Sequence, residues 1–250
     1  MVKQLIRAFG SIATLGLALS LTGCNAEGLT IGGQRGVPLA DLDLSGNAAP
    51  EITLLGPDNV HVVTGERLAI SVDGDPAVKD RLRFVLRDGK LGIGRKDNAW
   101  SSDAVANVTV TVPSTQRLIL AGSGTIDAGK VEGDKVRGDK AGITIAGSGT
   151  VHAPRIEAAN LAVEVLGSGT LQAGGKVDSL KLTLAGSGEA KMDGLGAGSA
   201  KVDVAGSGRA SFASDGAVEA NIMGSGEVRV KGRATCKVSA MGSGKLVCTP

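Results

Sequence analysis

Aromatic side chains are scarce in this 250-residue chain. Tyrosine is absent, and one tryptophan and three phenylalanines make up the whole aromatic content. Sugar-binding grooves commonly stack their ligands on aromatic faces, so this shortage argues against a lectin or a polysaccharide lyase. Glycine is abundant, at 39 residues, yet an apolar content of 42% is too high for a disordered chain.

Histidine is also rare. The two histidines, His61 and His152, lie far apart in the sequence, and neither has a second ligand at the spacing of a metal site. His152 is interpreted as a surface residue and not as a metal ligand or general base. The sequence predicts no metal site, no cofactor and no catalytic residue.

Residues 1–23 have the pattern of a bacterial lipoprotein signal peptide. Lys3 and Arg7 supply a basic start, and an apolar run too short to span a bilayer leads to a small residue directly before Cys24. We expect residues 1–23 to be removed and Cys24 to be lipidated, which anchors the protein to a membrane of the cell envelope. Because Asn25 and not Asp follows, the known sorting preference predicts the outer membrane of a Gram-negative cell, on either face.

The mature chain carries no net charge. Removal of Lys3 and Arg7 lowers Lys+Arg from 27 to 25, which equals the 25 Asp+Glu. A neutral chain is not built to bind nucleic acid. Residues 24–37 are Gly-rich without a strand pattern, and we interpret them as a flexible tether.

A Gly-Ser-Gly triplet occurs seven times in the second half of the chain. The copies begin at residues 122, 147, 167, 186, 206, 224 and 242, at intervals of 25, 20, 19, 20, 18 and 18 residues. The side chains two and four places before and after each triplet are apolar, so each unit reads as strand, corner, strand with one face inward. Such units predict the stacked coils of a β-solenoid over residues 116–250.

The region before the triplets is also strand-rich. Strands are expected at 39–44, 51–55, 60–63, 68–72, 82–86, 91–93 and 105–112, with one short helix that begins at Asp75-Pro76. Because a solenoid needs an atypical end to cover its first coil, residues 38–115 are interpreted as a cap and first irregular coils. With residues 116–250 they form a single domain, 38–250.

Other functional interpretations of the triplets are excluded by the residues that follow them or by the spacing of the glycines. Calcium-binding coils place aspartate after their glycines, but Thr125, Thr150, Thr170, Glu189, Arg209, Glu227 and Lys245 follow these triplets. A phosphate loop and a nucleophile elbow both need other glycine spacings. The residues after the triplets instead predict a threonine ladder continued by alternating charges on one face.

Two further features were considered as sites. Cys236 and Cys248 flank the last triplet in an oxidising compartment, where they form either a disulfide that closes the final coil or two buried thiols. Arg137-Gly138-Asp139 spells the integrin tripeptide within a charged stretch, residues 129–140, that reads as a solvated loop.

The sequence resembles the "putative auto-transporter adhesin, head GIN domain" family. A lipoprotein signal opens the pattern of this family, and the segment Asp88-Gly89-Lys90-Leu91-Gly92-Ile93 and the serial triplets match the rest of the pattern over about residues 38–248. The resemblance implies a right-handed parallel β-helix with the triplets along one edge, and a role in cell adhesion. It supplies no catalytic residues.

The first hypothesis is therefore a lipid-anchored structural or adhesive β-helix that is not an enzyme. Its surface would bind a polysaccharide or protein ligand that the sequence does not identify. A polysaccharide-active β-helix enzyme is the alternative, and an envelope partner protein is a third. The shortage of aromatics and the lack of paired carboxylates at repeated positions weigh against the enzyme.

Overall fold

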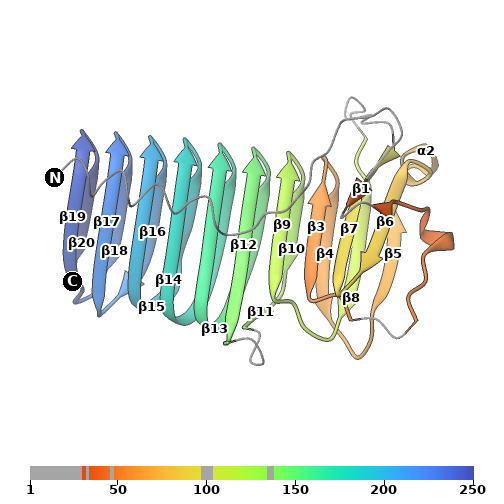
Figure 1. Ribbon diagram of the computed structural model, residues 1–250, viewed down its shortest axis with the longest axis horizontal. Coiled ribbons are helices and arrows are strands. Elements are labelled where there is room, and N and C mark those ends of the chain that lie inside the picture. Colours follow the sequence, from red (N-terminus) through yellow and green to blue (C-terminus); the bar gives the residue numbers. More distant parts are fainter. Residues whose placement is uncertain (1–29, 32–33, 46–47, 97–103, 134–137) are drawn as a thin grey trace.

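The computed structural model describes residues 30–31, 34–45, 48–96, 104–133 and 138–250. In these ranges the fold is all-β, with an 18-stranded, mostly parallel sheet and a separate two-stranded pair. Figure 1 shows an elongated stack, with β19 and β20 at one end and β5 and β6 at the other. None of the helices within the described ranges has the length and apolarity needed to cross a membrane.

Short strands make up the N-terminal part of the stack and long ones its middle. The strands are β1 (Thr30–Ile31), β2 (Gln34–Arg35), β3 (Glu51–Leu55), β4 (Asn59–Thr64), β5 (Ala69–Asp73), β6 (Leu82–Arg87), β7 (Lys90–Arg95), β8 (Asn107–Val112), β9 (Arg117–Gly122), β10 (Thr125–Ala128), β11 (Val131–Glu132), β12 (Lys140–Gly147), β13 (Thr150–Gly167), β14 (Thr170–Gly186), β15 (Glu189–Gly206), β16 (Arg209–Ser214), β17 (Ala217–Gly224), β18 (Glu227–Lys231), β19 (Thr235–Gly242) and β20 (Lys245–Thr249). One 3₁₀ helix, η2 (Leu39–Asp41), and one α-helix, α2 (Pro76–Lys79), complete the described elements.

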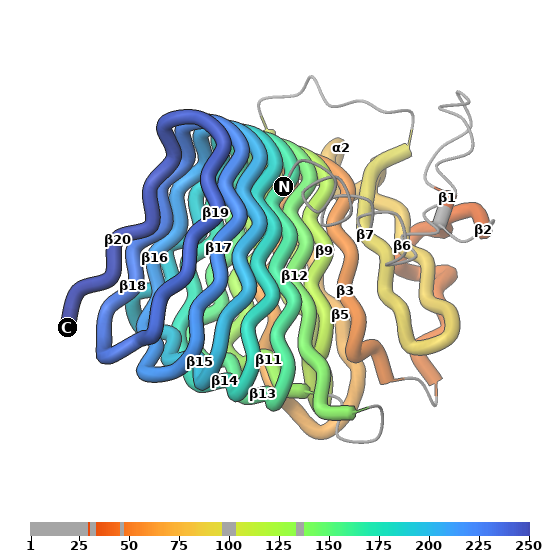
Figure 2. Tube along the Cα trace, turned by 60° about the vertical axis from the view of Figure 1, so that its left-hand side comes forward, coloured from red at the N-terminus to blue at the C-terminus, as the bar shows by residue number. Residues whose placement is uncertain are grey.

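The triplets set the register of the stack. The first glycine of each triplet lies beside the first glycine of the next, from Gly122 to Gly242, and all these strand pairs are parallel. Strands before the triplets therefore form one side of the stack and strands after them the other (Figure 2). The predicted unit of strand, corner and strand is confirmed.

The core runs along the inside of the stack. The apolar residues two and four places from the triplets are buried, as the pattern predicts, except at Ala173 and in the last layer. There Val238 is 49% exposed, whereas Ala220, its neighbour one layer in, is fully buried. The inward face is thus covered by a following layer everywhere but at the C-terminal end.

Glycine is required at the corners. Gly167 has a φ of +115°, and a Cβ on it would lie 2.6 Å from the carbonyl oxygen of Gly147 in the preceding layer. That oxygen accepts a hydrogen bond from the N–H of Ser168 at 2.9 Å. A side chain at Gly167 would therefore meet both a disfavoured backbone conformation and the neighbouring chain.

The layers are not stacked in sequence order at the N-terminal end. Strand β3 lies between β7 and β9, and β4 lies between β8 and β10. Strands β3 and β4 therefore belong to an inner layer, and β7 and β8 lie in the layer outside it. Gly56-Pro57-Asp58 takes the place of a triplet in the inner layer, where the carbonyl of Gly56 accepts from the N–H of Gly124.

A cap closes this end. Strands β5 and β6 pair antiparallel with β8 and β7, and α2 lies between them in the sequence. The predicted helix is confirmed, because the Asp75 carboxylate accepts from the N–H of Ala77 and Pro76 is the first helical residue.

The strand predicted at residues 39–44 is wrong. Its first half is the 3₁₀ helix η2, in which the N–H groups of Asp41 and Leu42 bond the carbonyls of Pro38 and Leu39. Local bonds of this kind leave those donors unavailable for a strand ladder.

The region expected to be a tether is partly described. Strand β1 pairs antiparallel with β2, and Val37 forms a bridge with Phe84 on β6. Residues 1–29, which include the expected signal peptide and Cys24, lie outside the described residues.

Candidate binding surface

The outward side chains of the strands that follow the triplets form a continuous surface, here called the ladder face. It comprises the first, third and fifth places after each triplet, on β10, β13, β14, β15, β16, β18 and β20. The residues in the first place are Thr125, Thr150, Thr170, Glu189, Arg209, Glu227 and Lys245, each beside the next in the sheet.

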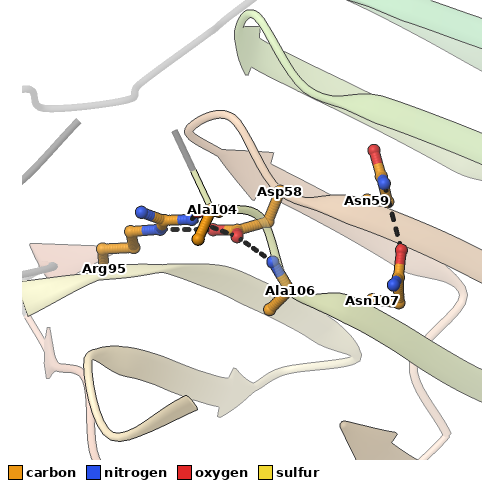
Figure 3. Close-up of polar contacts among 6 residues, drawn as sticks. All are labelled: Asp58, Asn59, Arg95, Ala104, Ala106 and Asn107. Atoms are coloured by element: carbon orange, nitrogen blue, oxygen red, sulfur yellow. Dashed lines mark hydrogen bonds and ion pairs between the residues drawn. The ribbon is translucent and has the colours of Figure 1, made fainter. Parts of the chain in front are cut away.

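The first row has the order predicted from the sequence. Three threonines are followed by side chains of alternating charge, and Arg209 Nη1 lies 3.4 Å from Glu189 Oε1. Beyond Thr125 the row continues into Asn59 and Asn107, whose side-chain amides form a 3.0 Å hydrogen bond (Figure 3). The register that places Glu189 and Arg209 on one face is confirmed.

Glu189 is the most strongly paired carboxylate of this row. Lys191 Nζ lies 2.8 Å from its Oε2, and Arg209 approaches the other oxygen. The hydrogen bond from Lys191 and its charge hold the pKa of Glu189 below its ordinary value, and Arg209 adds to this effect. Glu189 therefore stays ionised to lower pH than a free glutamate.

The row that contains Asp127, in the third place after its triplet, brings together the two histidines of the chain. His61 Nδ1 lies 3.3 Å from Asp127 Oδ2, and His152 Nε2 lies 3.9 Å from Asp127 Oδ1. The sequence indicates a surface position for His152, and both histidines are partly exposed, but they share one carboxylate. No group of three or more His, Cys, Asp or Glu within the described ranges could hold a metal ion.

Asp127 is the residue that the sequence reasoning missed. Asp127 and His152 both stand in the third place after their triplets, so their contact follows from the repeat. His61 could not be placed in this way, because its layer has Gly56-Pro57-Asp58 in place of a triplet.

A groove of about 640 Å³ crosses the C-terminal half of the ladder face. Its lining residues come from β15, β16, β18 and β20 and are Glu189, Ala190, Lys191, Asp193, Arg209, Ala210, Ser211, Glu227, Arg229, Lys231, Val247 and Thr249. Ser211 is short and lies between Lys191 and Arg229 of the adjacent strands, and Val247 is short and lies beside Arg229 on the last strand, which leaves the hollow. The hydroxyl of Ser211 donates to Asp193 Oδ2 at 2.8 Å.

A second hollow of about 490 Å³ adjoins the groove. His152, Gln172 and Gly174 are among its lining residues, and Lys191 and Asp193 line both hollows. The ladder face is therefore recessed from the histidine pair almost to the C-terminal end of the stack.

The charges of the groove are paired but exposed. Arg229 Nε lies 2.9 Å from Glu227 Oε1, and Lys231 Nζ lies 3.8 Å from Asp193 Oδ1. Exposed pairs of this kind contribute only about 0–1 kcal/mol each, so a ligand with hydroxyl or ionic groups can exchange for them at little cost. This arrangement is suited to binding through many weak polar contacts.

The other predicted sites lie elsewhere. A disulfide joins Cys236 on β19 to Cys248 on β20, across a sequence separation of 12 residues. Cys24 and Arg137 lie outside the described residues.

Asp139 of the integrin-like tripeptide is turned toward its own chain. Its Oδ2 accepts a hydrogen bond from the N–H of Ala159 at 3.1 Å, and Asn160 Nδ2 donates to the carbonyl of Gly138. An aspartate held in this way is not presented to solvent as an integrin ligand requires.

Solved structures share this architecture. A protein of Parabacteroides distasonis titled a putative lipid binding protein is 25% identical, with a TM-score of 0.62 over 84% of this chain and 99% of its own. A putative adhesin of Bacteroides fragilis is 16% identical, with a TM-score of 0.71 over 82% of this chain and 93% of its own. A putative adhesin of Parabacteroides merdae is 18% identical, with a TM-score of 0.58 over 81% and 92%. No curated protein matches the chain.

The family assignment follows from the sequence match. Residues 50–234, from β3 to the turn before β19, match the family described as "putative auto-transporter adhesin, head GIN domain". The match covers most of the described stack, including the ladder face up to β18. The chain is a member of this GIN-domain family.

Proposed function

We propose that the protein is a lipid-anchored adhesive protein of the cell envelope and that it binds its ligand with the ladder face. The observation that carries the proposal is the groove across β15, β16, β18 and β20, with the short side chain of Ser211 between Lys191 and Arg229 and charges of both signs around it. The ligand class that such a groove suits is a polar polymer, either a surface polysaccharide or an extended protein segment.

The fold proposed for this function is a right-handed parallel β-helix. Parallel strands joined by crossover connections are right-handed in about 98% of known cases. The register of successive triplets supports stacked coils, and the preference of crossover connections supports a right-handed winding of those coils. An elongated rod of this kind presents the same outer face over its whole length.

The proposed anchor is lipid on Cys24. The sequence before it has the basic start, the apolar run and the small residue that lipoprotein processing requires. Metabolic labelling with a clickable fatty acid should label the wild type but not Cys24→Ala. Surface labelling of intact cells then decides which face of the outer membrane carries the protein, and an unlabelled mature wild type refutes the anchor.

Two observations support binding and not catalysis, one on similar proteins and one on the repeat of this chain. The similar solved structures are described as putative adhesins or as a putative lipid binding protein. The repeat also places like residues at like positions, whereas catalysis needs unlike groups that converge on one point. We therefore propose no hydrolase or lyase activity.

The test is to fill the groove. Ser211→Phe places a large side chain at its centre, and Thr183→Phe places the same side chain outward on the opposite side of the stack, where Leu182 and Leu184 point inward. Purified lipid-free protein is incubated with a panel of envelope and matrix polysaccharides and with intact cells. We expect Ser211→Phe to reduce binding at least tenfold and Thr183→Phe to leave it unchanged.

Two results contradict the proposal. Equal binding by wild type and Ser211→Phe would show that the ligand does not bind in the groove. Release of oligosaccharide from any member of the panel, lost on mutation of one acidic or basic residue, supports the alternative of a polysaccharide-active enzyme.

A further inference from the structure

The two ends of the stack are not alike. At one end β5 and β6 cover β8 and β7 with antiparallel pairing. At the other end β19 pairs with β17 and β20 pairs with β18, and no strand within the described ranges pairs with their outer edges. The C-terminal end, here called the open edge (β19 and β20), therefore presents unpaired backbone donors and acceptors on both sides of the stack (Figure 1).

The open edge also exposes the apolar interior. Val238 and Ala240 on β19 are exposed, Val238 to 49%, and Leu246 on β20 is half-buried. In the layer directly inside, Ala220, Ile222 and Val228 are fully buried. Free strand edges beside exposed apolar side chains are the features onto which an additional strand docks.

The positive charge of the open edge indicates which kind of partner could bind there. After Glu227 the chain contains five basic residues, Arg229, Lys231, Arg233, Lys237 and Lys245, and no acidic residue. Lys237 and Lys245 lie on the two outermost strands. Within the described part of the chain neither ammonium group has an ion-pair partner. A second copy of this chain would bring the same cations to the contact, and edge lysines are a common device against such self-pairing.

The ladders show which charge belongs in the next layer. On one outer side the row reads Lys181, Lys201, Glu219, Lys237, with charge that alternates over the last three layers, and on the other it reads Arg209, Glu227, Lys245. Both rows end on a lysine. A carboxylate in the following position would continue the alternation on both sides of the stack.

We infer that the open edge binds an acidic, extended segment of a partner protein, which adds a further strand layer to β19 and β20 with its carboxylates beside Lys237 and Lys245. The main-chain bonds would supply most of the affinity and the lysines the selectivity. The inference does not rest on the proposed function. Lys237 lies on the side of the stack opposite the ladder face, so a change there separates the two.

The chain itself provides the probe. Residues 217–228 (AVEANIMGSGEV) contain Glu219 and Glu227, the residues that lie beside Lys237 and Lys245 in the structure. A fluorescein-labelled peptide of this sequence with blocked termini should bind the lipid-free protein in an anisotropy titration. The matched control peptide carries Glu219→Lys and Glu227→Lys, and we expect it to bind at least tenfold more weakly.

Charge reversal of the protein completes the test. Lys237→Glu should weaken binding of the acidic peptide at least fivefold and strengthen binding of the control peptide, and circular dichroism verifies that the variant is folded. Equal affinity for both peptides, or no binding of either, overturns the inference. So does a dimer of the peptide-free protein in light scattering, since a second copy then occupies the edge. Vesicles containing phosphatidylglycerol that displace the bound acidic peptide would assign the cations to a membrane surface instead.

Discussion

Arg95 and Asp58 form a buried, two-point ion pair between the outermost layer of the stack and the layer inside it. Arg95 Nη2 donates to Asp58 Oδ1 at 2.6 Å and Nε donates to Oδ2 at 2.8 Å, while the two side chains are 3% and 0% exposed (Figure 3). The N–H of Ala106 donates to Asp58 Oδ1, and Arg95 Nη2 also reaches the carbonyl of Ala104. The pair thus ties β7 and the start of β8 to the corner before β4.

Loss of Arg95 should destabilise the fold strongly. Arg95→Ala leaves the Asp58 carboxylate buried without its countercharge, and such changes lower the free energy of unfolding by about 3–5 kcal/mol. The matched control is Arg233→Ala, because Arg233 is 86% exposed and its ion pair with Asp215 is worth about 0–1 kcal/mol. Urea unfolding followed by circular dichroism measures both, and equal effects would contradict the structural role of the pair.

The same pair explains what the sequence could not predict about layer order. The triplets indicate the register from residue 116 onward, because each one marks the same corner of its layer although the intervals range from 18 to 25 residues. In the inner layer Gly56-Pro57-Asp58 keeps only the first glycine, so no repeat indicates that β3 and β4 lie inside β7 and β8. This order is seen in pairings between strands far apart in the chain and in contacts such as that of Asp58 with Arg95, 37 positions away, which local patterns do not reveal.

Substitution at a corner glycine should disrupt two layers. Gly167→Ala forces a non-glycine residue to a φ of +115° and places a Cβ 2.6 Å from the Gly147 carbonyl oxygen. Strain of this type destabilises by about 1–3 kcal/mol. Ser168→Ala is the matched control, because the serine side chain is exposed and its N–H, which bonds Gly147, is retained. Thermal unfolding should separate the two variants by several degrees, and an unchanged melting temperature for Gly167→Ala would refute the requirement.

The candidate surface was predictable in part. The alternation of Glu189, Arg209 and Glu227 follows from their common place after the triplets, and the structure has it. The groove depends instead on side-chain length, since Ser211 and Val247 are short where their neighbours are long. A pattern of polar and apolar residues identifies the outward face but not where that face is recessed.

Acidic pH should reduce the stabilisation that ionised Glu189 gives to the ladder face. Because Lys191 and Arg209 lower the pKa of Glu189 in the folded state, the ionised carboxylate stabilises the fold above the unfolded pKa. This contribution is lost as the pH falls through the folded pKa, below the ordinary range of glutamate. Glu189→Gln should remove that part of the acid sensitivity, which unfolding curves between pH 7 and pH 3 measure.

Glu219→Gln is the comparison for this experiment, because Glu219 lies on the opposite outer side of the stack. It removes one acidic side chain that lies away from Lys191 and Arg209. Identical pH profiles for wild type and Glu189→Gln would show that the ion pairs with Lys191 and Arg209 do not contribute.

The last prediction concerns the disulfide at the open edge. Cys236 on β19 and Cys248 on β20 join the two strands of the final layer, on which no other strand of the described ranges packs. In the chain-entropy account a crosslink over a loop of this length stabilises by about 2–4 kcal/mol. Because the layer is terminal, we expect the double variant Cys236→Ser with Cys248→Ser to unfold locally in this layer, with loss of amide-exchange protection in β19 and β20 and retention in β14 and β15.

Dithiothreitol should reproduce this loss of protection in the wild type and leave the double variant unchanged. Two thiols titrated by Ellman's reagent in unreduced protein would show that the bond does not form.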